Sequence, residues 1–248
     1  MSDTAVVVGG GSGIGAAVAL AYAQAGRNAL VWDIAGAHDI ECDVRDAEAI
    51  DKALAETIER VGVPSELTIT AGVGHSGLLL DESVAEWDRV FAINTRGPLL
   101  VMRAVAKALI NEGKSGSIVV TSSVSARLVD RAMGTYCASK AALSMLTQVA
   151  ACEWGPHRIR VNAVAPGVTE TPMLGRAPSG GEWFAAVAGR TALGRLGRPD
   201  DLAQGVLALH GLGWVTGQIL ECDGGLGLHS PIDAYGESQK AAGTWGRR

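Results

Sequence analysis

A tyrosine and a lysine separated by three residues form a pair that could move protons. Tyr136 and Lys140 occur in the sequence Tyr-Cys-Ala-Ser-Lys, and Ser123 precedes the tyrosine by thirteen residues. Side chains four positions apart on a helix share one face, so the phenol and the ammonium can lie side by side. A unit charge about 4 Å away is worth roughly 4 kcal/mol at an effective dielectric near 20, or about three pKa units. The pattern predicts that the pKa of Tyr136 is lowered toward neutrality, as acid–base catalysis requires. The same spacing also fits two side chains on a plain helix surface.

Short β-branched runs alternate with longer helical patterns along most of the chain. The expected strands are residues 5–8, 29–32, 67–70, 117–121, 160–163 and 218–221, and the expected helices are residues 13–25, 46–60, 84–111, 133–153 and 200–209. This alternation implies right-handed crossovers and a parallel sheet that helices cover on both faces. Tyr136 and Lys140 then lie on a covering helix. Ser123 follows the carboxyl end of a strand, where ligands bind in open sheets.

Composition and charge exclude several classes of partner. The chain has 248 residues, of which 48% are hydrophobic, and its net charge is -5 without any run of Lys or Arg. A substantial core is expected, and neither nucleic acid nor a membrane is an expected partner. Four scattered cysteines, Cys42, Cys137, Cys152 and Cys222, predict reduced, mostly buried thiols of a cytoplasmic protein. His38 and Cys42 have a metal-compatible spacing, but no second Cys/His cluster accompanies them, so no metal site is expected.

A glycine-rich turn follows the first expected strand and opens the first expected helix. Residues 9–15 read Gly-Gly-Gly-Ser-Gly-Ile-Gly. Glycines let the backbone approach a pyrophosphate, and the following helix N-terminus offers free N–H groups and a partial positive charge. Two spacings fit the string, Gly11-x-Gly13-x-x-Ala16 and Gly9-x-x-x-Gly13-x-Gly15. Both predict dinucleotide binding.

Asp33 indicates which dinucleotide is bound. It ends the second expected strand twenty residues after Gly13, where a carboxylate can accept hydrogen bonds from the adenosine ribose hydroxyls. The same carboxylate would repel a 2′-phosphate, and neither Ser12 nor Ile34 supplies a basic group to neutralise one. NAD is therefore favoured over NADP. A solvated aspartate capping a turn is the alternative.

From residue 5 to residue 226 the chain resembles the short-chain dehydrogenase/reductase family. The matching motifs are Gly9-x-x-x-Gly13-Ile14-Gly15, Asp43-Val44, Thr70-Ala71-Gly72, Asn94, Ser123, Tyr136 with Lys140, Pro166-Gly167 with Thr171, and Asp223-Gly224-Gly225. The resemblance implies one Rossmann-type α/β domain, residues 1–225, whose doubly wound parallel sheet has about seven strands in the order 3-2-1-4-5-6-7. Residues 1–115 would form its cofactor half and residues 116–225 its catalytic half. Residues 226–248 would be a C-terminal extension.

The resemblance also implies roles for particular residues. The reaction would be hydride transfer between C4 of a nicotinamide and an alcohol or carbonyl carbon. Tyr136, as a phenolate stabilised by Lys140, would take the alcohol proton while Ser123 orients the reacting oxygen. Lys140 would also hold the nicotinamide ribose, and Asn94 would support a water that relays the proton. The implied cofactor contacts are Gly9, Gly11, Ser12, Gly13, Ile14, Gly15, Asp33, Asp43, Val44, Ala71, Gly72, Tyr136, Lys140, Pro166, Gly167, Val168 and Thr171.

Some features depart from the family pattern. Ile69-Thr70 replaces the usual pair of Asn residues, and Val8 stands where a Thr is usual. Only nine residues separate Asp33 from Asp43, so the helix that commonly links the second and third strands is expected to be missing. Asn94 falls inside the helical pattern 84–111, where Asn has poor propensity, and a local kink is expected there.

A lid over the substrate is expected at residues 173–193, where glycines give flexibility and two aromatic residues give apolar surface. The expected substrate contacts are Val73, His75, Val124, Ser125, Met133 and Trp183. They imply a small to medium, mainly apolar alcohol or ketone. For His75, a solvated position in a loop is the alternative.

Three functional hypotheses remain. The first is an NAD-dependent dehydrogenase of secondary alcohols. The second is a reductase of 3-oxoacyl thioesters, which would usually want NADPH and a basic docking surface. The third is a non-catalytic dinucleotide-binding protein, against which the four intact catalytic positions argue. The family resemblance further implies a homo-oligomer, a tetramer rather than a dimer.

Overall fold

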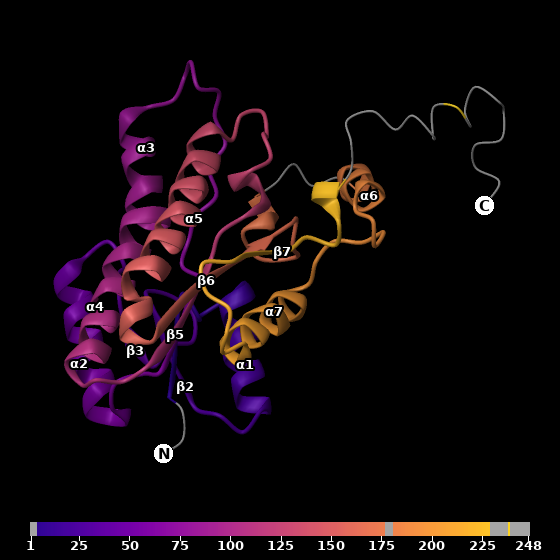
Figure 1. Cartoon of the computed structure of the whole chain (residues 1–248). Helices are drawn as coiled ribbons and strands as arrows, with labels where there is room; N and C mark the ends of the chain where they lie inside the picture. Colours follow the sequence, from indigo (N-terminus) through magenta and orange to yellow (C-terminus); the bar gives the residue numbers. More distant parts are fainter. Residues whose placement is uncertain (1–3, 177–180, 229–237, 239–248) are drawn as a thin grey trace.

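The sheet has the predicted topology. The computed structural model describes residues 4–176, 181–228 and 238, and its seven parallel strands lie in the order β3-β2-β1-β4-β5-β6-β7 (Figure 1). The strands are β1 (Ala5–Val8), β2 (Ala29–Asp33), β3 (Ile40–Glu41), β4 (Glu66–Ile69), β5 (Gly116–Thr121), β6 (Ile159–Pro166) and β7 (Ile219–Cys222). The predicted fold class, a single doubly wound domain, is confirmed.

Helices cover both faces of this sheet. They are α1 (Gly13–Gln24), α2 (Ala47–Val61), α3 (Val84–Phe91), α4 (Gly97–Asn111), α5 (Gly134–Trp154), α6 (Gly181–Arg190) and α7 (Pro199–Gly211). Successive side chains of a strand point to opposite faces. Val6 and Val8 accordingly pack in the core beneath α2, α4 and α5, whereas Ala5 and Val7 pack in the core beneath α1 and α7. Figure 1 shows these two groups of helices on opposite sides of the sheet.

The connection from β2 to β3 contains no helix, as the spacing of Asp33 and Asp43 predicts. Residues 34–39 cross directly to β3, and Asp39 accepts a hydrogen bond from the backbone N–H of Val31 at 2.8 Å. Two residues of strand carry no readable alternation, which is why β3 is absent from the expected strands.

The helical pattern of residues 84–111 is interrupted at the predicted kink. A π-helical turn, η1 (Ala92–Arg96), separates α3 from α4 and contains Asn94. Such turns insert one extra residue per turn and occur frequently at functional sites. The kink therefore marks the position from which the Asn94 side chain enters the interior.

The predicted lid and tail fall partly outside the described residues. Within the lid, Leu174–Arg176 form a 3₁₀ turn and residues 181–190 form α6, whereas Pro178 and Gly180 lie outside the described residues. Of the C-terminal extension, Leu226–Leu228 form a 3₁₀ turn. Apart from residue 238, the rest of the extension lies outside the described residues.

The four cysteines form no disulfide. All four cysteines are free, but Cys42 alone is fully buried and Cys152 is exposed, so the prediction of mostly buried thiols is wrong. No group of three or more potential ligands among the described side chains is arranged to hold a metal ion. In the described part of the chain, no helix is long and apolar enough to cross a bilayer.

Candidate active site

The start of α5 carries the two residues with which acid–base chemistry was predicted. Lys140 is 4% exposed, and its Nζ donates a hydrogen bond to the backbone oxygen of Thr121 at 2.8 Å. The same Nζ lies 5.9 Å from the centroid of the Tyr136 ring. The structure therefore brings phenol and ammonium to one face of the helix, directly beside the carboxyl end of β5.

Ser123 joins this pair from the other side. It lies two residues beyond β5, is buried, and caps a short 3₁₀ turn by accepting a hydrogen bond from Ser125 N at 3.1 Å. The Ser123 side chain also lies close enough to the Tyr136 phenol to lower its pKa. Because β5 and α5 are on opposite sides of this contact, the two hydroxyls are held together by the sheet and its covering helix.

Burial changes the acidity of both groups. Desolvation raises the pKa of Tyr136, and the nearby Ser123 hydroxyl offsets only part of that rise. Burial lowers the pKa of Lys140 to about 8. The prediction that Tyr136 has a lowered pKa is therefore wrong for the protein alone. The physical reason is that the packing that brings the pair together also removes both charges from water.

Asn94 ties the loop after β4 to the catalytic helix. Its Oδ1 accepts a hydrogen bond from Val73 N at 2.8 Å, and its Nδ2 donates to Val73 O at 2.9 Å and to Ser139 Oγ at 3.1 Å. Ser139 in turn donates to Tyr136 O at 2.7 Å. The fully buried Asn94 thus fixes the position of α5 relative to Val73.

The glycine loop has the shape of a phosphate cradle. A Cβ at Gly15 would lie 2.2 Å from Gly9 O, and one at Gly9 would lie 2.4 Å from Ala71 N. Thr70, which replaces an Asn of the family pattern, donates to Gly9 O at 2.9 Å and so braces the loop. Ser12 caps α1 without a side-chain hydrogen bond, and the first turn carries no acidic residue. The positive end of α1 is therefore suited to a pyrophosphate.

Asp33 lies against the same loop. One carboxylate oxygen accepts a hydrogen bond from Gly11 N at 2.8 Å, and the other accepts from Ile34 N at 2.7 Å and from Ala35 N at 3.2 Å. These three N–H groups hold the carboxylate at the end of β2, beside the cradle. The residues at this end fit the adenosine half of a dinucleotide, and the carboxylate is the predicted acceptor for ribose hydroxyls.

Asp43 and Val44 border this end of the site with different roles. Arg45 binds both oxygens of Asp43, which lowers the pKa of that carboxyl. Val44 is buried and touches Gly97, where an added Cβ would lie 2.8 Å from Val44 Cγ2. The guanidinium of Arg45 is thus engaged by Asp43, and the predicted adenine contact of the pair stays a prediction.

The remaining residues that are predicted to contact the cofactor lie between this cradle and Tyr136. A Cβ at Gly72 would lie 3.3 Å from Lys140 Nζ and 3.4 Å from Asn94 Oδ1. Ala71 N bonds Val8 O at 3.2 Å. Pro166 ends β6, and Gly167 and Val168 follow it. A Cβ at Gly13 would be 3.5 Å from the Thr171 side chain, so the segment after β6 reaches the start of α1. Ile14 lies in the first turn of α1.

Five of the six predicted substrate residues fall into two groups. Val73, Val124, Ser125 and Met133 lie on the loops that flank Ser123 and Tyr136, and Trp183 lies on α6 in edge-to-face contact with Phe184. Their contact with substrate stays a prediction. Met173, at the start of the predicted lid, lies close to Gly74, where an added Cβ would be 3.6 Å from its sulfur.

His75 is largely buried and paired with carboxylates, so the alternative of a solvated position in a loop is wrong. Its Nε2 lies 2.8 Å from a Glu82 carboxylate oxygen, its Nδ1 lies 3.5 Å from Glu86, and its side chain is 15% exposed. Glu82 also accepts a hydrogen bond from Thr135, the residue before Tyr136. Sequence reasoning missed both Glu82 and Thr135, because neither belongs to a motif.

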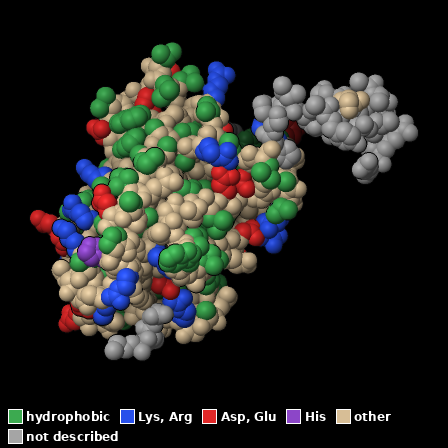
Figure 2. All heavy atoms as spheres, in the orientation of Figure 1, with side chains coloured by type: hydrophobic (Ala, Val, Ile, Leu, Met, Phe, Trp, Pro, Cys, Tyr) green, Lys and Arg blue, Asp and Glu red, His purple; other side chains and the backbone are tan. Residues whose placement is uncertain are grey.

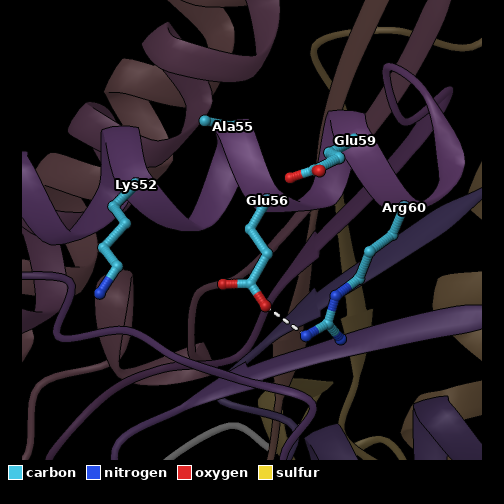
Figure 3. A pocket seen from close by; sticks show the side chains of 5 residues that line it. All are labelled: Lys52, Ala55, Glu56, Glu59 and Arg60. Carbon is cyan, nitrogen blue, oxygen red and sulfur yellow. Dashed lines mark hydrogen bonds and ion pairs between the residues drawn. The ribbon is translucent and has the colours of Figure 1, made fainter.

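Two hollows in the described part of the protein lie away from these residues. One is formed by the outer side of α2, where Glu56 pairs with Arg60 beside Lys52 (Figure 3). The other, of about 630 Å³, lies near the amino ends of β4, β5 and β6, and its polar lining includes Glu66 and His210. Neither contains a predicted site residue. Glu66 bonds Tyr22 and Arg27, and His210 bonds Thr68 and Ser117.

Comparison with known proteins places this arrangement in a family. The sequence model described as Enoyl-(Acyl carrier protein) reductase matches residues 9–227. A (3R)-3-hydroxyacyl-CoA dehydrogenase from Canis lupus familiaris is 35% identical, covering 91% of this chain and 96% of the relative. A galactitol 2-dehydrogenase (L-tagatose-forming) from Cereibacter sphaeroides is 36% identical, covering 89% of this chain and 93% of the relative.

Solved structures agree. A short-chain type dehydrogenase/reductase from Mycobacterium marinum matches with a TM-score of 0.83 and 30% identity, covering 90% of this chain and 95% of that structure. Ligand-free aldohexose dehydrogenase from Thermoplasma acidophilum matches with a TM-score of 0.87 and 26% identity, covering 94% and 97%. This chain belongs to the short-chain dehydrogenase/reductase family of oxidoreductases that act on hydroxyl and carbonyl groups.

Proposed function

We propose that this protein is an NAD-dependent enzyme that interconverts a secondary alcohol and its ketone. The observation that carries the proposal is that Ser123, Tyr136 and the buried ammonium of Lys140 lie together at the carboxyl ends of the strands. Bound NAD supplies the hydride acceptor for alcohol oxidation, and NADH the donor for ketone reduction. The protein supplies binding, orientation and proton transfer.

Two hydroxyl groups hold the reacting oxygen. Ser123 orients it, and Tyr136 takes its proton in the oxidative direction or returns one in the reductive direction. The raised pKa of Tyr136 suits the protonated phenol to reduction near neutral pH. Oxidation should speed up as the pH rises, because a larger fraction of the phenol is then ionised. Lys140 favours that phenolate while it keeps its proton.

Asn94 is proposed to connect Tyr136 to solvent. Its amide already makes three hydrogen bonds, to both backbone groups of Val73 and to Ser139. One Oδ1 lone pair remains as an acceptor for a relay water. The same hydrogen bonds hold Val73 in the place where it is proposed to border the nicotinamide.

NADH should bind at least about tenfold more tightly than NADPH, because Asp33 faces the extra phosphate with a like charge. A fluorescence titration of the protein with each cofactor measures the ratio. Asp33→Ala should lower this affinity ratio, because it weakens the binding of NADH and removes the charge repulsion that opposes the binding of NADPH. Asp39→Ala is the matched control. Asp39 also accepts a hydrogen bond from a backbone N–H, that of Val31 in β2, but it lies at the β3 end of the connection between β2 and β3. Equal affinities in the unaltered protein would remove the preference for NAD.

The substrate is proposed to have apolar surface beside its hydroxyl. Leu79 and Leu80 on one flanking loop and Val129 on the other are exposed, and Figure 2 shows apolar side chains gathered at the upper end of the molecule. A second candidate function, reduction of 3-oxoacyl thioesters, is favoured by the 35% identity to the hydroxyacyl-CoA enzyme.

A panel of alcohols distinguishes the two candidates. It should contain a (3R)-3-hydroxyacyl thioester, galactitol and a cyclohexadiene diol, the last because a 2,5-dichloro-2,5-cyclohexadiene-1,4-diol dehydrogenase is 31% identical. Simple apolar secondary alcohols complete it. Turnover of the thioester with NADP rather than NAD would favour the second candidate. Binding of NADH without turnover of any member would favour a non-catalytic dinucleotide-binding protein.

The protein is also proposed to form a homo-oligomer. Met145 and Val149 on α5 and Leu220 on the edge strand β7 are exposed apolar residues of regular elements. Such residues on two separate surfaces favour a tetramer over a dimer. Light scattering of the purified chain would distinguish tetramer, dimer and monomer by mass.

A further inference from the structure

The carboxylate of Glu82 joins the loop after β4 to the first turn of the catalytic helix. Its two oxygens lie 3.0 and 2.8 Å from Nε2 of His75, and one of them also accepts a hydrogen bond from Thr135 Oγ1. The Glu82 side chain is 9% exposed and Thr135 is fully buried. Hydrogen bonds to a carboxylate shielded from water are among the stronger ones in proteins.

The start of α5 needs such a contact. The helix begins after Met133 without a side-chain cap and without an acidic residue in its first turn. Ala132, just before it, has the left-handed φ of 65°, a conformation that costs free energy unless neighbouring structure holds it. Glu82 places a negative charge at this positive helix end from a different element.

The same loop holds this turn at a second point. Gly77 N donates to Ala132 O at 2.7 Å, and Gly77 pairs with Met133 in an isolated bridge. His75 keeps the Glu82 carboxylate in place from the opposite side. The other ring nitrogen of His75 faces Glu86, which is itself paired with Arg89. Ionised Glu82 fits this surrounding, and the hydrogen bond from Thr135 lowers its pKa.

We propose that Glu82 is a positioning residue that acts through Thr135 to fix the Tyr136 phenol against Ser123. Thr135 is the residue directly before Tyr136, so its hydroxyl anchors the turn from which the phenol projects. Asn94 and Ser139 anchor the next turn of the same helix. The proposal rests on the proposed function. It adds that the catalytic geometry depends on a carboxylate whose hydrogen bond is to Thr135, the neighbour of Tyr136 in the chain.

A matched pair of variants at Thr135 tests the role. Thr135→Val keeps the size of the buried side chain but removes the hydroxyl, whereas Thr135→Ser keeps the hydroxyl. Thr135→Val should lower kcat about tenfold, because small displacements of a catalytic group are costly, while the KM for NAD and for the alcohol stays within about twofold. Thr135→Ser should restore kcat. A normal kcat in Thr135→Val would overturn the proposal even if that variant were less stable.

A double-mutant cycle tests whether Glu82 and Thr135 act together. Glu82→Gln should also lower kcat, since an amide is a weaker acceptor for Thr135. Glu82→Gln combined with Thr135→Val should be no slower than Thr135→Val alone, because both changes break one contact. Losses that multiply would show two independent effects and would contradict the proposed link.

Hydrogen exchange separates this proposal from the proposed function, because it needs no turnover. Backbone amides of residues 133–137 should exchange faster in Thr135→Val and Glu82→Gln than in the unaltered protein, and at the original rate in Thr135→Ser. Unchanged exchange in both would overturn the contact itself. Suppose that exchange is faster in both variants but the unaltered protein turns over no alcohol. That result would confirm the contact between Glu82 and Thr135 and would overturn both the proposed function and the positioning role.

Discussion

Replacing Tyr136 with phenylalanine should lower turnover about a thousandfold and leave the affinity for NADH within about twofold. The substitution removes only the hydroxyl that lies beside Ser123, and the ring keeps its place on α5. Without that hydroxyl no group at this position can exchange a proton with the reacting oxygen. Turnover is followed by the absorbance of the reduced cofactor, and affinity by fluorescence titration.

Tyr22→Phe is the matched control for this experiment. Tyr22 is also buried, and its hydroxyl donates a hydrogen bond of 2.6 Å to Glu66. Glu66 begins β4, so this contact lies at the amino ends of the strands, away from the candidate active site. Loss of that hydrogen bond to a carboxylate should cost about 1.5–3 kcal/mol of stability without changing kcat. Undiminished turnover in Tyr136→Phe, or an equal loss in both variants, would contradict the assigned role of Tyr136.

Lys140→Met should abolish most activity and yet raise the free energy of unfolding at about pH 7 by about 1–2 kcal/mol. The pKa of Lys140 falls from 10.5 to about 8 on folding because the ammonium is desolvated. That difference corresponds to about 3 kcal/mol. Methionine avoids this cost. It also leaves Thr121 O without its hydrogen-bond donor, which lowers the free energy of unfolding by about 1–2 kcal/mol.

The pH dependence of this gain follows from the direction of the shift. Below about pH 8 Lys140 is protonated in both the folded and the unfolded chain, so folding carries the full desolvation cost. Between about pH 8 and 10.5 the folded protein has lost the proton while the unfolded chain still holds it, so the unaltered protein gains stability as the pH rises. The advantage of Lys140→Met should therefore shrink across this range.

Urea unfolding at about pH 7 and about pH 10.5 measures this change. A variant that is less stable than the unaltered protein at neutral pH would contradict the burial cost assigned to Lys140. So would an advantage that is equal at both pH values. The expected result is a trade of stability for function at a catalytic lysine.

The parts of the fold that could be predicted are those with a period or a motif. The hydrophobic strands and amphipathic helices carry readable periodicities, and Gly26 and Gly113, with φ of 69° and 62°, end helices as left-handed glycines do. The strand Ile40–Glu41 is too short for any period. Residues 181–190 form α6 within the predicted lid of residues 173–193, and this helix was not among the expected ones.

The site divides in a similar way. Its backbone cradle and the positions of Asn94 and Asp33 could be predicted because they belong to ordered motifs. The link from Glu82 to Thr135 could not, since it joins a loop residue to a residue of α5 that is 53 positions away. The direction of the Tyr136 pKa was also wrong, because desolvation depends on tertiary packing that a four-residue spacing does not reveal.

Hydride transfer from an alcohol carbon to NAD is the event on which the proposed function depends most directly. It can be measured by incubating the protein with NAD and alcohols of the panel that carry deuterium on the carbinol carbon, and then recording the NMR spectrum of the reduced cofactor. One deuterium at C4 of the nicotinamide for each ketone formed is the expected result. Reduced cofactor without deuterium, or ketone formed without reduced cofactor, would contradict it.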